Sequence, residues 1–152
     1  MAFSNEAALK AALIEACTNA VAQVEEKVYA EFSGNLNQYY TEFIPAEYIR
    51  TGALYNSLDR TEVQSSGNGA SADVFFNTPS YQKGMMPLQN TPIHGRYGWA
   101  TWSGQKVLDT AMHGSHGGYV DGTAIWDDSM VSLGGKAGIK AMLIQALKAQ
   151  GL

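Results

Sequence analysis

The chain has 152 residues and a mass of 16.4 kDa, the usual size of a single domain. Hydrophobic residues make up 45%, enough to bury a core, whereas charged residues make up only 16%, against about a quarter in a typical domain. The net charge of −4 argues against a general nucleic-acid binder, and the single cysteine excludes an internal disulfide. We expect a soluble, single-domain protein made in the cytosol, without a signal peptide or membrane span, whose sparsely charged surface is partly covered by neighbours.

The first part of the chain, residues 1–33, predicts one long helix from about Asn5 to Phe32. Either Ser4 or Asn5 can cap its first turn. The sequence Ser33-Gly34-Asn35 predicts its end, since glycine and asparagine commonly follow a helix. Apolar side chains at spacings of three and four form one stripe along it: Leu9, Leu13, Cys17, Ala20, Val24 and Val28.

The second part, residues 34–77, predicts a short helix and a hairpin. Thr51-Gly52 is typical of a turn that starts a short helix through Leu58. Two strands are expected at residues 60–65 and 72–77. The linker between them, residues 66–69, has the sequence Ser-Gly-Asn-Gly and predicts a tight turn, because glycine and asparagine tolerate positive φ.

The third part, residues 78–102, predicts an extended loop without regular periodicity. A loop of this length is unusual in a compact domain unless it is functional or ordered by a partner. Its apolar and aromatic content favours a partner, so we expect the contact with another subunit or with a partner protein at these side chains: Met85, Met86, Tyr97, Trp99 and Trp102.

The last part, residues 103–152, is expected to be mainly helical. A helix is predicted near residues 103–112, followed by a glycine-rich loop at 113–123 and a short strand or helix start at Ile125-Trp126. A final amphipathic helix runs from about residue 136 to 150, and Gly151 closes it. The whole order predicts an α+β fold: a small antiparallel sheet packed by a long N-terminal helix and a C-terminal helix, with a long irregular loop.

Charge is unevenly distributed along the chain. Residues 1–62 hold nine acids and four bases, a net charge of −5, whereas residues 129–152 hold three lysines and no acid, a net charge of +3. One interpretation is that Lys140 and Lys148 only complement the dipole at the end of their helix. The other is that the two ends attract in a head-to-tail contact between identical subunits, as a ring requires.

Three histidines are the candidates for metal chemistry. His94, His113 and His116, with Asp121, could supply ligands to zinc or iron. Their spacing matches no HExxH or paired CxxC motif, so a glycine-rich turn with polar histidines is the favoured interpretation. Asp127-Asp128 is expected to cap a helix rather than act as an acid–base pair. We therefore predict no catalytic residue, no metal and no cofactor.

Two short motifs and their order carry a family resemblance. Pro45 precedes the segment Thr51-Gly52-Ala53-Leu54-Tyr55-Asn56-Ser57, and the second strand ends in Asn77-Thr78-Pro79-Ser80-Tyr81. A variable loop, a tryptophan-bearing segment at 99–102 and Trp126 before a terminal helix follow. This layout resembles the neck and tail-completion proteins of long-tailed bacteriophages, and the minor capsid proteins similar to them. The motif residues are Thr51, Gly52, Leu54, Ser57, Asn77, Pro79 and Tyr81.

The resemblance implies a structural role in the virion, made in the host cytoplasm and located at the head–tail junction. Copies would form a ring that joins the portal and its adaptor or head-closure protein to the tail terminator or tail tube. Thr51 and Ser57 would brace the short helix, Gly52 would supply backbone freedom, and Pro79 and Tyr81 would end the edge strand.

Two other functions remain open at this point. One is a minor capsid or capsid-decorating protein that binds the shell; the other is a small metal-dependent hydrolase that uses the histidines. No membrane partner and no sequence-specific nucleic acid is expected.

Overall fold

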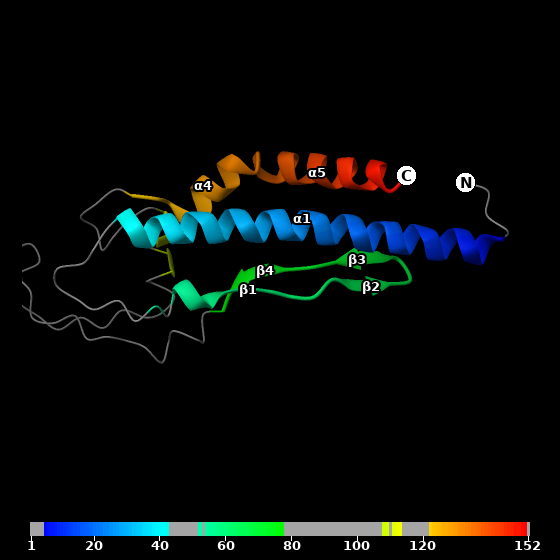
Figure 1. Ribbon diagram of the computed structural model, residues 1–152, viewed down its shortest axis with the longest axis horizontal. Coiled ribbons are helices and arrows are strands. Elements are labelled where there is room, and N and C mark those ends of the chain that lie inside the picture. The colour runs from blue at the N-terminus through cyan, green and yellow to red at the C-terminus, as the bar shows by residue number, and fades with distance from the viewer. Residues whose placement is uncertain are drawn as a thin grey trace, which may run out of the picture. The chain divides into compact units, whose positions relative to one another are not determined.

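The computed structural model describes residues 5–42, 52, 54–77, 108–109, 111–113 and 122–151. It confirms the α+β fold class, with a long N-terminal helix, two small two-stranded antiparallel sheets and C-terminal helices among these residues (Figure 1). The loop expected at 78–102 lies outside the described residues. The elements are α1 (Glu6–Glu42), the 3-10 helix η1 (Tyr55–Ser57), β1 (Leu58–Arg60), β2 (Gln64–Ser66), β3 (Gly69–Ser71), β4 (Val74–Phe76), α4 (Ile125–Ser132) and α5 (Gly135–Ala149).

The chain divides into two compact units, and both include part of α1. The two units share one continuous helix. The expectation of a single domain stays a prediction. Unit 1 comprises Met1–Glu31, Arg60–Val74 and Met130–Leu152, and unit 2 comprises Phe32–Asp59 and Phe75–Ser129.

Helix α1 begins where the sequence predicts and ends ten residues later than predicted. Asn5 caps it, since the backbone N–H of Ala8 donates to Asn5 Oδ1 at 2.8 Å. The predicted end at Ser33-Gly34-Asn35 is wrong, because α1 continues to Glu42. Beyond Gly34 the helix still buries Leu36 and Tyr39, and this burial outweighs the low helix propensity of one glycine.

The hairpin of unit 1 is confirmed, with bounds that differ from the prediction. Strands β2 and β3 pair antiparallel around Gly67-Asn68, and Ser66 pairs with Gly69, so the linker is shorter than the predicted 66–69. Gly69 has φ +154°, which favours glycine there. Three residues separate β1 from β2, whereas two separate β3 from β4, so the first arm carries one extra residue, as in a β-bulge.

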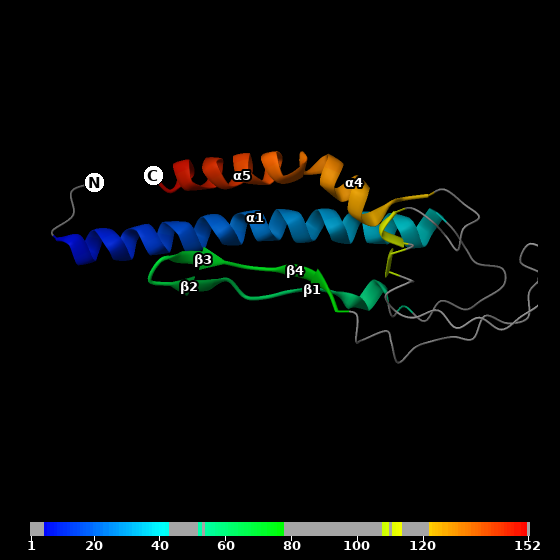
Figure 2. The ribbon, with the colours of Figure 1, turned by 180° about the vertical axis from the view of Figure 1, so that it is seen from behind.

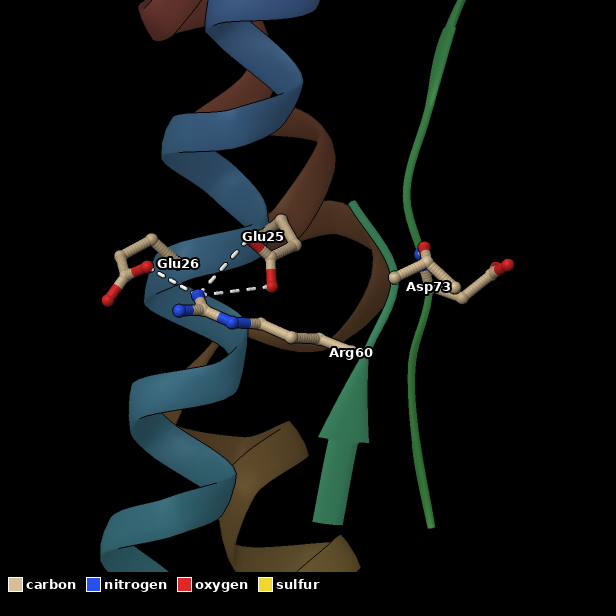
Figure 3. A network of polar contacts seen from close by, with 5 residues as sticks. Glu25, Glu26, Arg60 and Asp73 are labelled. Carbon is tan, nitrogen blue, oxygen red and sulfur yellow. Dashed lines mark hydrogen bonds and ion pairs between the residues drawn. The ribbon is translucent and has the colours of Figure 1, made fainter. Parts of the chain in front are cut away.

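Arg60 connects this hairpin to α1 through ion pairs with two glutamates. Its Nη1 donates to both carboxylate oxygens of Glu25, at 3.3 and 3.4 Å, and to Glu26 Oε2 (Figure 3). The guanidinium carbon also lies 4.6 Å from the ring centroid of Tyr29, a cation–π contact. The hydrogen bond with Glu26, and the charges of both glutamates, raise the pKa of Arg60 above its ordinary value. Arg60 therefore stays charged wherever the protein is folded.

Unit 1 places its elements on two sides of α1. In Figures 1 and 2 the β2–β3 end of the hairpin runs along one side of the N-terminal half of α1, and α5 runs along the other. The buried hydrophobic residues described in this unit are Ala16, Ala20 and Ala146. Such small side chains let neighbouring backbones approach closely. Of the predicted apolar stripe, Ala20 is fully buried, whereas Leu9 and Leu13 are each 38% exposed.

Two helices, α4 and α5, form the C-terminal part of the described chain. Ile125-Trp126 begins α4, which resolves the choice between a strand and a helix. Asp128 caps it, since the N–H of Ala124 donates to Asp128 Oδ2 at 2.9 Å. Helix α5 lies within one residue of its predicted bounds, and Gly151 follows it with φ +86°, the left-handed conformation common after a helix. Within the described ranges, no helix has the length and apolar character to cross a membrane.

A tight turn between α4 and α5 gives the first prediction. A Cβ atom at Gly138 would lie 2.0 Å from the carbonyl oxygen of Leu133, which is backbone and cannot rotate away. We expect Gly138→Ala to lower the free energy of unfolding by about 1–3 kcal/mol, measured by thermal denaturation.

Gly34→Ala is the matched control, because a Cβ there meets no atom within 4 Å. In the middle of α1 this change should raise stability by about 1 kcal/mol, since alanine is the better helix former. Equal stability of the two variants would contradict the packing described at the turn.

Candidate assembly site

The two segments that carry the family resemblance meet in unit 2. Ser57 is the last residue of η1, and Asn77 directly follows β4. The backbone N–H of Asn77 donates to the carbonyl oxygen of Ser57 at 2.6 Å. The Thr51–Ser57 motif and the start of the Asn77–Tyr81 motif are therefore adjacent in space, although a whole hairpin separates them in the chain.

The first of these segments is internally braced. Gly52 has φ +72°, in the left-handed region that favours glycine, and its carbonyl accepts from the N–H of Asn56 at 2.9 Å. Leu54 and Ser57 are buried, and the Ser57 hydroxyl donates to the Leu54 carbonyl at 2.7 Å. The side chain of Ser57 thus satisfies a buried backbone acceptor, so its role is to fix the shape of the segment.

Two tyrosines connect this segment to α1. The hydroxyl of Tyr40 accepts from the backbone N–H of Tyr55 at 3.2 Å, and the hydroxyl of Tyr55 donates to Asn37 Oδ1 at 2.8 Å. Their rings meet edge to face with centroids 5.5 Å apart. Tyr55 remains exposed, so one face of this pair is open to a partner.

An aromatic cluster forms where α1, β4 and α4 contribute to unit 2. The ring of Phe32 is buried and lies 6.3 Å from that of Phe76 and 5.4 Å from that of Trp126, measured between centroids. Trp126 is nevertheless 47% exposed, and Phe75, which precedes Phe76 on β4, is 40% exposed. The cluster therefore combines a buried anchor with aromatic surface that is accessible from outside.

Polar contacts fix α4 against the C-terminal part of α1. Ser129 is fully buried; its hydroxyl accepts from Asn35 Nδ2 at 2.9 Å and donates to the Ile125 carbonyl at 2.6 Å. Glu42 Oε2 accepts from the backbone N–H of Thr123 at 2.8 Å. These contacts hold Trp126 in position beside Phe32.

His113 is the one histidine of the metal hypothesis that the structure describes. It is exposed, and its Nδ1 lies 3.0 Å from Asp127 Oδ2. Among the described residues, no group of three or more histidine, cysteine, aspartate or glutamate side chains is placed to hold a metal. The other proposed ligands, His94, His116 and Asp121, lie outside the described residues.

Several predicted interface and motif residues also lie outside the described part of the chain: Thr51, Pro79, Tyr81, Met85, Met86, Tyr97, Trp99 and Trp102. The sequence analysis did not predict that Phe75 and Trp126 are partly exposed, or that Phe32 is the buried member of their cluster. The alternation of side chains along β4 would have placed Phe75 on the other face of the strand from Val74 and Phe76. No local sequence pattern predicts that a tryptophan is partly exposed.

Comparison of this chain with protein-family models, with curated proteins and with solved structures finds no match.

The buried serine of the motif gives the second prediction. Ser57→Ala removes the hydroxyl that donates to the Leu54 carbonyl at 2.7 Å, and that carbonyl then keeps only the longer hydrogen bond from the Ser57 N–H at 3.1 Å, so the free energy of unfolding should fall by about 1 kcal/mol in urea denaturation. Ser65→Ala, on the exposed strand β2, is the control and should change stability by less than about 0.5 kcal/mol. Equal effects from the two changes would show that Ser57 does not brace the segment.

Proposed function

We propose that this chain is a structural protein of a bacteriophage virion, a neck or tail-completion protein. Copies assemble into a ring at the head–tail junction. The ring joins the portal and its adaptor or head-closure protein to the tail terminator or tail tube.

The observation that carries the proposal is the hydrogen bond between the two motif segments. The resemblance rests on the Thr51–Ser57 and Asn77–Tyr81 segments and on their order. The 2.6 Å hydrogen bond from the Asn77 N–H to the Ser57 carbonyl joins the described parts of the two segments in one local structure, which supports the proposal. The long first helix, the hairpin and the terminal helix also follow the layout on which the resemblance rests.

The exposed aromatic side chains of unit 2 support a role in protein assembly. Tyr55, Phe75 and Trp126 are each 40–47% exposed. Aromatic side chains bury large areas at little entropic cost, and they are enriched at the centres of protein–protein interfaces. The segment 78–102, which begins within the Asn77–Tyr81 motif, contains two further tryptophans, Trp99 and Trp102.

The third prediction tests the proposal in the virus. In a phage with an amber codon in this gene, wild-type protein supplied from a plasmid should restore infectious particles. Trp99→Ala and Trp102→Ala variants should be soluble but leave filled heads and free tails unjoined in electron micrographs, because each removes a large aromatic contact.

Val131→Ala is a matched control, since Val131 is 80% exposed on α4 and its loss removes apolar surface elsewhere. It should restore the wild-type yield. Normal yields from both tryptophan variants would contradict the proposed contact. Joined particles with the protein spread over the shell would instead favour the capsid-decorating alternative.

A further inference from the structure

Helix α5 presents a basic row to solvent. Lys136, Lys140 and Lys148 are exposed, and Ile144 between the last two is 42% exposed. These four residues recur every four positions, so they lie on one face of the helix. Residues 130–151 contain no acid, so nothing on α5 offsets the three positive charges.

The stability of α5 does not account for this row. Lys148 lies in the last turn, where it complements the helix dipole, but Lys136 lies in the first turn, where a cation opposes it and no acid is present. Lys136 and Lys140 also repel each other at i, i+4. None of the three forms an ion pair with another residue that the structure describes.

The hairpin side of unit 1 carries the opposite charge. Glu62 and Asp73 are exposed on its two arms, and the carboxylate of Asp73 points away from Arg60 (Figure 3). Glu25 and Glu26 share the single cation of Arg60. Together these five side chains hold four negative charges and one positive, a net charge of −3, equal and opposite to that of the α5 row.

The hairpin tip differs from its base. The Nζ of Lys10 on α1 lies 3.9 Å from the position that a Cβ of Gly67 would occupy. A positive charge therefore lies next to the tip of the hairpin. The excess negative charge is therefore concentrated at the base, where Thr61 pairs with Asp73 through hydrogen bonds of 2.9 Å.

We propose that the α5 row of one copy of this chain docks against the acidic surface of the next copy. That surface is the base of the hairpin and the adjoining turn of α1, with the side chains Glu25, Glu26, Arg60, Glu62 and Asp73. The two surfaces lie on opposite sides of α1 within unit 1, so one molecule cannot pair them with each other (Figures 1 and 2). A second copy offers an acidic surface to the basic row of the first copy and a basic row to its acidic surface. The contact is heterologous, and repetition of it gives a ring if the rotation closes and a filament if it does not.

A second copy fits better than a polyanion. The row has three lysines and no arginine, and the chain as a whole carries a charge of −4, so a nucleic acid would be repelled beyond the row. The exposed Ile144 in the middle of the row adds an apolar contact that a phosphate backbone would not use.

Sedimentation velocity of the purified chain over a range of concentrations tests this contact. Association should be strong at about 50 mM salt and at least about tenfold weaker at about 500 mM, because salt screens exposed charges. The triple variant K136E/K140E/K148E should remain monomeric. It should keep its fold, checked by circular dichroism, since glutamate is a good helix former and suits the first turn.

A charge swap makes the test specific. The variant E62K/D73K should also remain monomeric alone, whereas its mixture with the triple lysine variant should associate again, because each then offers the charge that the other lacks. Lys27→Glu on the exposed part of α1 is the control for altered net charge and should associate like the wild type.

Two results would overturn the inference: a monomeric wild type at every concentration and salt, or association that the triple variant retains. This inference deepens the proposed function by naming its self-contact, yet the two fail separately. A failed charge swap with normal amber complementation by wild-type protein would remove this interface and leave the neck role. Failed complementation with a successful swap would do the reverse.

Discussion

The burial of one face of α1 along its C-terminal part is the constraint on which the described fold depends. Phe32, Leu36 and Tyr39 are all at most 8% exposed. Burying such a side chain is worth about 1.5–3 kcal/mol each, whereas Gly34 costs the helix about 1 kcal/mol. Burial therefore keeps the helix continuous past a sequence that otherwise favours a stop. Those ten further residues include Tyr40, which accepts from the Tyr55 N–H, and Asn35, which donates to the buried Ser129 hydroxyl.

The same comparison explains which features the sequence could predict. The start of α1 at Asn5, the turn after α5 at Gly151 and the tight hairpin turn each depend on one or two neighbouring residues with special backbone chemistry. Such local signals are visible in a sequence. The end of α1 was predicted wrongly because it depends on what packs against the helix, and the extra residue between β1 and β2 left no mark in the alternation of side chains.

The candidate site depends even more on distant contacts. Trp126 and Phe32 come from opposite ends of the chain, and Arg60 contacts glutamates of a different element. No spacing rule predicts these pairs. The motif residues are an intermediate case: Gly52 and Ser57 could be named from their own segment, but their hydrogen bond to the strand end at Asn77 appears only in the fold. What the sequence does state directly is the charge imbalance between the two ends of the chain.

These features support the proposed role of the chain among neighbouring subunits. Few charges and aromatic side chains that are only partly covered are typical of surfaces that contact other chains. Native mass spectrometry of the purified chain tests this account most directly, because one spectrum gives both the subunit number and any bound metal. We predict a closed ring of identical subunits without metal. A monomer that retains one zinc or iron per chain would contradict the account and favour the hydrolase.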